Sequence, residues 1–405
     1  MNLLTNGRVI TRDEGGKGYY EKGAVAYEGT KIVEVGEEAA LRAKYPQAEI
    51  IDAKGGVIMP AFINAHTHIY SALARGLSIV GNNPTNFYEV LDGTWWAMDR
   101  KLTLEGSRAS ADALYIDCIK QGVTTIFDHH AAYCEIPGSL FQIGESAKKF
   151  GIRSCLCYEV SDRDGEEKCL QAIKENADWI TYCEQQKDPM LAAMFGGHAL
   201  FTISDKTFDR MVEANNGRTG YHIHVSEGMN DVYDSLQNYG RRPVQRLQDH
   251  GILGPKTILG HCIHVNTAEM EIIKETGTMV VNNPESNMGN AIGICPVLQL
   301  HKRGILLGMG TDAYTNDMLE SLKVALCSQR SQNCLPNVGW CEVTDMLFKN
   351  NAKIGAKYFP DQLGVLKAGA AADIIVMDYK PFTPFSDENI DGHMIFGMTG
   401  RQCQT

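Results

Sequence analysis

Two histidines separated by a single residue follow an apolar run near the start of the chain. The run is "VIMPAFI" (57–63), and the pair is His66 and His68 in "NAHTHIYSALARGL". Side chains two positions apart on a strand point to the same face, so the two imidazoles would face one place. Such a pair is costly in an apolar core but suits a divalent metal ion. Taken alone, it is more often two surface histidines in a loop.

Further side chains suited to metal binding or acid–base chemistry occur at the ends of other apolar runs. His222, His224 and Glu227 lie in "GYHIHVSE", His261 ends "TILGHC", and Asp312 ends "ILLGMGTD". Three imidazoles and a carboxylate suit a borderline divalent ion such as Zn²⁺ and leave space for water. A neighbouring glutamate can carry protons. Because these residues are far apart in sequence, the chemistry requires a fold that brings them together.

The central part of the chain alternates apolar, β-branched runs with amphipathic segments. Eight such runs are "VIMPAFINAH", "GVTTIFDHH", "IRSCLCYEV", "HALFTIS", "GYHIHVSE", "TILGHC", "GTMVVNN" and "ILLGMGTD". Helix-like segments lie between most of them, for example at 107–122 and 140–151. Buried strands separated by helices are typical of parallel βα units, and eight close a (β/α)8 barrel. An open, doubly wound sheet is the alternative. In a barrel the polar residues at the strand ends would converge at one rim.

The two ends of the chain have a different pattern. Residues 1–56 alternate short β-rich runs with turns, and hairpins are expected to turn at Asn6-Gly7 and Glu28-Gly29. A matching β-rich segment returns at 363–384. We therefore expect an α/β protein with two units. One is a (β/α)8 barrel of residues 58–362, and the other is a small β-sandwich domain composed of residues 1–57 and 363–405.

Composition limits the class of protein. The 405 residues are 44% hydrophobic and 21% charged, as in globular proteins. A formal charge of -11 without a basic cluster argues against nucleic acid or an anionic membrane as a partner, and "GRRPVQR" (240–246) is interpreted as a solvated helix face. We expect a cytoplasmic protein, because no secretory signal and no membrane-spanning run is visible. Cys155 and Cys157 are expected to be buried free thiols.

In their order along the chain, the motifs resemble those of the amidohydrolase superfamily. They are "INAHTHIYSALARG", "HIHVSE", "LGHCIHV", "NNPESNMGNAIG", "GMGTDA" and "LGVLKAGAAADIIVMD". The resemblance covers nearly the whole chain. It is greatest to the metal-dependent branch that includes guanine deaminase, S-adenosylhomocysteine deaminase and the s-triazine hydrolases. It implies one bound metal ion, usually zinc and sometimes iron, and a homodimer or other homo-oligomer. It also implies a further strand beyond "GRQCQT".

The resemblance also implies a role for each site residue. The metal ligands would be His66, His68, His224 and Asp312. Glu227 would carry the proton, His261 would contact the attacking water or the substrate, and Asp312 would also orient the hydroxide. Substrate contacts are expected from Trp96, His198 and Asn287. His222 could replace His224 as a ligand, but the H-x-x-E spacing to Glu227 favours His224.

These residues favour a hydrolase that replaces an exocyclic amine of a nitrogen heterocycle, purine-like or related, with oxygen and releases ammonia. The same scaffold could instead expel chloride or open a cyclic amide. A metal-free, non-catalytic assembly protein is the alternative of a different class. A single metal is expected, because dinuclear relatives carry a carboxylated lysine at the end of strand four. Here "HALFTIS" ends without lysine, and Lys206 lies beyond the expected position.

Overall fold

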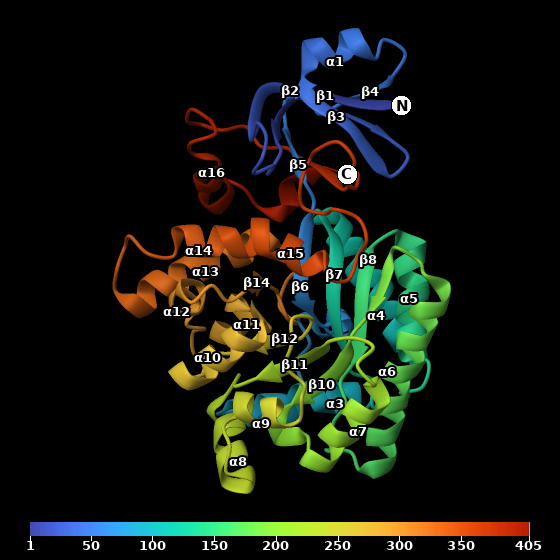
Figure 1. Cartoon of the computed structure of the whole chain (residues 1–405), viewed down its shortest axis with the longest axis vertical. Helices are drawn as coiled ribbons and strands as arrows, with labels where there is room; N and C mark the ends of the chain where they lie inside the picture. The colour runs from blue at the N-terminus through green and yellow to red at the C-terminus, as the bar shows by residue number, and fades with distance from the viewer. Residues whose placement is uncertain (405) are drawn as a thin grey trace.

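The computed structural model describes residues 1–404, and its larger unit is built on two parallel sheets (Figure 1). The first contains β6 (Phe62–Thr67), β7 (Val123–His130), β8 (Arg153–Tyr158) and β9 (Leu191–Ala193). The second contains β10 (Phe195–Ala199), β11 (Tyr221–Val225), β12 (Ile258–His261), β13 (Met279–Asn282) and β14 (Leu307–Met309). Isolated bridges join Thr67 to Asp312 and Val160 to Gly197. The two sheets therefore contact each other at two places.

Helices alternate with these strands, as predicted. They are α2 (Phe87–Val90), α3 (Trp96–Asp99), α4 (Leu104–Lys120), α5 (Ser139–Phe150), α6 (Glu166–Gln186), α7 (Asp205–Asn215), α8 (Met229–Tyr239), α9 (Pro243–Asp249), α10 (Thr267–Thr276), α11 (Pro284–Gly289), α12 (Val297–Lys302), α13 (Met318–Asn333), α14 (Trp340–Asp345) and α15 (Asn351–Gly355). The strands β6, β8 and β10–β14 are buried at every position, because helices cover the parallel sheets. No helix within residues 1–404 is long and apolar enough to cross a bilayer.

The two ends of the chain join in one further sheet, at the top of Figure 1. Its strands are β1 (Asn2–Ile10), β2 (Tyr19–Glu28), β3 (Lys31–Glu37), β4 (Glu49–Asp52), β5 (Val57–Pro60), β15 (Ile374–Met377) and β16 (Cys403–Gln404). The order is β16-β15-β5-β1-β2-β3, with β4 also paired to β1. Two short helices, α1 (Glu38–Lys44) and α16 (Ile390–Phe396), accompany it. The predicted pairing of the two ends is confirmed, whereas a sandwich of two sheets is not.

Three local expectations were wrong. Asn6-Gly7 does not turn a hairpin: Asn6 adopts a left-handed conformation (φ 56°), the register shifts, and β1 continues because Arg8 and Val9 pair with β5. The fourth run is displaced toward the N-terminus, since β10 ends at Ala199 and Leu200–Thr202 forms a 3₁₀ turn.

The third wrong expectation concerns the basic stretch 240–246. Arg246 is only 1% exposed and is not on a solvated face. Its guanidinium donates to the carbonyl oxygens of Leu200 and Ile203 and lies 2.6 Å from an oxygen of Asp205. Acceptors on the segment between β10 and α7 therefore compensate for its burial.

Candidate metal centre and active site

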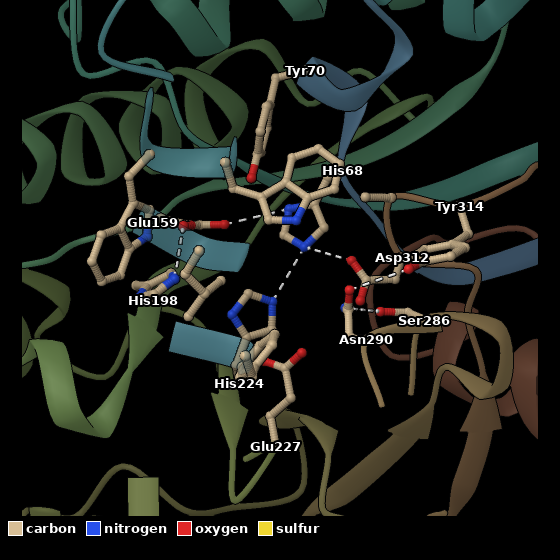
Figure 2. A pocket seen from close by; sticks show the side chains of 15 residues that line it. His68, Tyr70, Glu159, His198, His224, Glu227, Ser286, Asn290, Asp312 and Tyr314 are labelled. Atoms are coloured by element: carbon tan, nitrogen blue, oxygen red, sulfur yellow. Dashed lines mark hydrogen bonds and ion pairs between the residues drawn. The ribbon is translucent and has the colours of Figure 1, made fainter. Parts of the chain in front are cut away.

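The predicted site residues come together at the carboxyl ends of the parallel strands (Figure 2). His66 lies in β6 and His68 directly follows it, while His222 and His224 lie in β11. His261 ends β12 and Asp312 follows β14. The side chains in the cavity wall here are those of His68, Tyr70, Phe87, Leu91, Trp95, Trp96, Glu159, His198, His224, Glu227, Ser286, Asn290, Asp312, Ala313 and Tyr314.

The separations of four predicted ligands suit a shared ion. His68 Nε2 lies 3.0 Å from Asp312 Oδ1 and 3.3 Å from His224 Nε2. His66 Nε2 lies 4.0 Å from the same Asp312 oxygen. Two atoms that each bind one zinc ion at about 2.1 Å can be at most about 4.2 Å apart. These pairs meet that limit.

Groups of possible ligand atoms, all within 4.8 Å of one another, overlap across the site. They are His66, His68 and Asp312; His66, His224 and His261; Glu227, His261 and Asp312; and His68, His129, Glu159 and His224. All of these side chains are buried. The Nε2 atom of His66 is also buried and has no hydrogen-bond partner, which is unfavourable unless a cation occupies the site. The donor set therefore fits a divalent metal.

Hydrogen bonds orient two of these imidazoles. His68 Nδ1 lies 2.6 Å from the carbonyl oxygen of His129, so Nδ1 donates and Nε2 keeps its lone pair for the cluster. His66 Nδ1 lies 2.8 Å from His222 Nε2. Contacts of this kind fix the tautomer and direction of metal-binding histidines. His222 therefore contacts the ring of His66 and is not in the cavity wall.

Glu227 and His261 form a further group with Asp312. His261 Nε2 is 3.6 Å from Glu227 Oε1 and 3.5 Å from Asp312 Oδ2. Burial, followed by the charge of Asp312, raises the pKa of Glu227 well above its usual value. A carboxyl group with a raised pKa can take up and release a proton near neutral pH.

Asn287 reaches the site only through His261. Its Oδ1 accepts a hydrogen bond from His261 Nδ1 at 2.7 Å, and its Nδ2 donates to Asn282 at 3.0 Å. The cavity wall contains Ser286 and Asn290 from this segment instead. Asn287 therefore orients His261, and its predicted contact with a substrate stays a prediction.

The backbone is strained where three strands end at the site. Ser226, His261, Cys262 and Asp312 have positive φ values of 49°, 68°, 49° and 56°. Such values are uncommon for residues other than glycine and concentrate at functional sites. His261 and Asp312, two of the four, belong to one group of possible ligand atoms together with Glu227.

Trp96 and His198 both face the cavity, as predicted for substrate contacts. Trp96 is 4% exposed, and its ring centroid lies 5.9 Å from that of His198.

Glu159 is a further site residue, which the sequence motifs did not predict; it follows β8 and is 2% exposed. Burial raises the pKa of Glu159, but the neighbouring imidazoles outweigh this and hold it below its usual value. Among them, His129 Nδ1 lies 3.0 Å from Glu159 Oε1 and donates to it. Burial lowers the pKa of His198 to about 3. The feature of the sequence that could have indicated Glu159 is its position, as a polar residue at the end of a predicted strand.

Lys206 lies outside the site. It is in α7, is exposed, and is 3.5 Å from Glu166. No lysine is among the residues that form the cavity wall within the described chain. The side chain that bridges two metals in dinuclear relatives thus has no counterpart in this cavity.

Comparison with known proteins places the chain in a family. The sequence profile of the amidohydrolase family matches residues 57–401, and that of an imidazolonepropionase-like composite domain of bacteria matches residues 23–48. The chain is 30% identical over 414 residues to the 5'-deoxyadenosine deaminase of Methanosarcina barkeri, covering 100% of this chain and 90% of that protein.

Solved structures share the fold. Guanine deaminase of E. coli has a TM-score of 0.84 at 19% identity, covering 100% of this chain and 97% of that chain. An atrazine chlorohydrolase of Arthrobacter aurescens, complexed with zinc, has a TM-score of 0.81 at 24% identity. The match covers 100% of this chain and 93% of that chain. With a profile match over most of its length and a relative aligned along all of it, the chain belongs to the amidohydrolase family.

Proposed function

We propose that this chain is a metal-dependent hydrolase that deaminates a nitrogen heterocycle, purine-like or related, and releases ammonia. The observation that carries the proposal is the buried cluster of imidazoles and Asp312 at a cavity that also contains Glu227. The family and the deaminase activity named for the Methanosarcina relative support it.

One divalent ion is the cofactor in this proposal, zinc in the first instance and iron as the alternative. The proposed ligands are His66, His68, His224 and Asp312. The unpartnered Nε2 of His66 and the separations within the cluster support this set. When bound, such an ion supplies a hydroxide nucleophile at neutral pH by lowering the pKa of water to about 7.

The chain's own residues then move the protons. Glu227 accepts the proton of the attacking water and passes it to the ring nitrogen or to the departing amine, which its raised pKa favours. His261 Nδ1 donates to Asn287, and Asn283 Nδ2 lies 3.4 Å from His261 Nε2. Nε2 therefore bears one lone pair, which in this proposal accepts from the attacking water in place of the long contact with Asn283.

The finer architecture also belongs to the proposal. We infer that the two parallel sheets are the halves of a (β/α)8 barrel of residues 58–362, and that residues 1–57 and 363–405 form the small domain. The two bridges between the sheets and the fold of the solved relatives support a barrel. A cytoplasmic location and a homodimeric or other homo-oligomeric state stay predictions.

Chloride release is the second candidate activity, and the atrazine chlorohydrolase with the same fold favours it. The same attack on a ring carbon would serve both leaving groups. The metal-free assembly alternative is not supported, because it leaves the buried Nε2 of His66 without a partner.

A screen of zinc-loaded protein against a heterocycle library tests the proposal, with ammonia and chloride measured separately. Glu227→Gln should lower ammonia release at least about 1,000-fold and leave bound zinc unchanged, because it removes the proton carrier and not a ligand. Glu175→Gln is the matched control: this carboxylate is also buried, but it accepts from the backbone N–H groups of Gly138 and Leu140. Full activity of Glu227→Gln would refute the assignment.

A further inference from the structure

Glu159 presents one free carboxylate oxygen to the cavity. Its Oε1 lies 3.0 Å from His129 Nδ1 and 3.3 Å from His68 Nδ1. Its Oε2 faces His198 Nε2 at 3.8 Å, beyond hydrogen-bond distance (Figure 2). Both side chains form part of the cavity wall. The two atoms are therefore not hydrogen-bonded to each other, and both belong to side chains that a ligand in the cavity can contact.

His198 Nε2 is an acceptor, as the hydrogen bonds around the ring show. His198 Nδ1 lies 2.9 Å from Thr202 Oγ1, and that hydroxyl donates its proton to the carbonyl oxygen of Ala199 at 2.9 Å. A hydroxyl has a single proton, so Thr202 accepts from His198 Nδ1. Nε2 then carries the lone pair. Glu159 and His198 thus present two acceptors with no donor between them.

Glu159 lies one imidazole ring from the proposed metal position. His68 spans this distance, since its Nε2 contacts Asp312 and His224 while its Nδ1 lies near Glu159. A heterocycle attacked at the metal would therefore reach Glu159 with its far edge. That edge must contain hydrogen-bond donors to match the acceptor pair.

The charge of the cavity supports the same kind of ligand. Its wall contains three carboxylates, Glu159, Glu227 and Asp312, and no lysine or arginine among the described residues. The nearby Arg163 is 5.1 Å from the Trp96 ring and is paired with Asp99. A phosphate or carboxylate on the substrate would find no lysine or arginine side chain in this wall, whereas N–H groups are favoured by the carboxylates.

We propose that Glu159 and His198 select a heterocycle that bears a ring N–H or a second amino group in addition to the amine that leaves. This rests on the proposed deaminase function and names the substrate class. An amidine-like or guanidine-like edge, with adjacent N–H donors, matches the pair. An adenine substituted at N9 does not, because its N–H groups all belong to the leaving amine. The preferred substrate therefore differs from an adenine nucleoside.

Calorimetric binding to zinc-loaded Glu227→Gln protein tests this without turnover. Two matched ligand pairs each differ by one amino group: 9-methyladenine against 9-methyl-2,6-diaminopurine, and 4-aminopyrimidine against 2,4-diaminopyrimidine. The diamino member of at least one pair should bind at least 10-fold more tightly. Adding Glu159→Gln should reduce that preference to less than threefold, and adding Glu175→Gln should leave it unchanged.

His198→Leu in the same background gives a second, independent loss of preference, and thermal melting identifies any variant that fails to fold. The proposal is overturned if neither pair shows a preference, or if the preference survives in both folded variants. A failure of the proposed function has a different signature. There the preference and its dependence on Glu159 are present, but the wild-type protein releases no ammonia from any ligand.

Discussion

His66 is held in position by another histidine. The centroids of His66 and His222 are 4.8 Å apart, and the nitrogen atoms that face each other are 2.8 Å apart. If His66 Nε2 binds a cation, Nδ1 must carry the ring proton and donate it to His222. His222 therefore acts as a positioning residue, which orients a proposed ligand without touching the ion.

We predict that His222→Phe weakens zinc binding about 10–100-fold, because His66 loses the acceptor that fixes its tautomer. The dissociation constant, measured by competition with a chromogenic chelator, checks this. His264→Phe is the control, since His264 contacts the carbonyl oxygen of Ile292 away from the cluster. Equal zinc affinity in wild type and His222→Phe would contradict the assigned role.

For individual residues, the sequence predicted which side chains lie at the site better than it predicted the contacts that they make. The H-x-H pair, the H-x-x-E spacing and the strand-end Asp312 correctly indicated one cluster. Glu159 lies near the end of the apolar run "IRSCLCYEV" but was not predicted as a site residue, because its contacts depend on neighbours that adjacent strands supply. The direction of Asn287 also depends on a partner distant in sequence, His261.

Contact between β6 and β14 depends on a glycine. The backbone N–H groups of Thr311 and Asp312 both donate to the carbonyl oxygen of His66 at 3.0 Å. A Cβ atom at Gly310 would lie 2.7 Å from this oxygen and from the Cβ of His66. Since no other residue fits without displacement, Gly310 keeps His66 and Asp312 close together.

Gly310→Ala should lower the free energy of unfolding by about 1–3 kcal/mol, through overpacking. It should also weaken zinc binding, because His66 is displaced. Chemical denaturation and the zinc dissociation constant measure the two effects. In Gly254→Ala, where nothing lies within 4 Å of the added Cβ, neither should change. If Gly310→Ala has the unfolding free energy and the zinc affinity of wild type, the close contact between residue 310 and His66 is not required.

Glu285 in α11 is a partly buried residue that lies near Asp317 and Glu320, at the N-terminus of α13. Burial, then the charges of Glu320 and Asp317, raises its pKa to about 8, and its Oε1 has no hydrogen-bond partner. The folded state holds this proton more tightly than the unfolded chain, where the pKa is near 4.5. Stability is therefore lost as the pH rises from about 4.5 to 8.

Glu285→Gln mimics the protonated form and should remove this loss. We expect the variant to gain on the order of 2–4 kcal/mol over wild type at pH 8.5, and little at pH 4.5. Urea denaturation across this pH range measures the difference. The exposed Glu167→Gln should follow the wild-type curve. A gain that does not depend on pH would exclude titration of Glu285 as its cause.

Element types followed from the sequence more reliably than their boundaries. Apolar runs and amphipathic spacing predicted the alternation of strands and helices in the middle of the chain. The hairpin turn predicted at Asn6-Gly7 is wrong, because the left-handed residue Asn6 lies at a register shift inside β1. Pairing with β5 then extends the strand beyond it. Local propensity could not reveal that partner.

The two units of the whole molecule are joined by charged groups. Arg153 of β8 is 4% exposed and pairs with Asp373, next to β15, and with Asp361 at 3.3 Å. Lys31 of β3 lies 2.6 Å from Asp361. These ion pairs thus connect a strand of the parallel sheet, β8, to the C-terminal segment and to the N-terminal strand β3. These pairings span up to 330 positions, so no local pattern in the sequence could predict them.

Arg153→Met should destabilise the protein by about 1–3 kcal/mol, since it leaves two partly buried carboxylates without their partner. Steady-state ammonia release should stay within twofold of wild type, because Arg153 is remote from the cavity wall. Thermal and urea unfolding measure the loss, with the exposed Arg108→Met as control. An unchanged melting temperature would mean that the ionic contacts contribute nothing to holding the units together.

The central claim is that side chains from distant parts of the chain bind one ion. Metal analysis of purified protein after zinc loading and removal of free metal tests it most directly. We predict about one equivalent of zinc per chain in wild type and Glu227→Gln, and less than about 0.1 equivalent in His68→Ala and Asp312→Ala under the same conditions. No bound zinc in wild type, or a full equivalent in both ligand variants, would contradict the account.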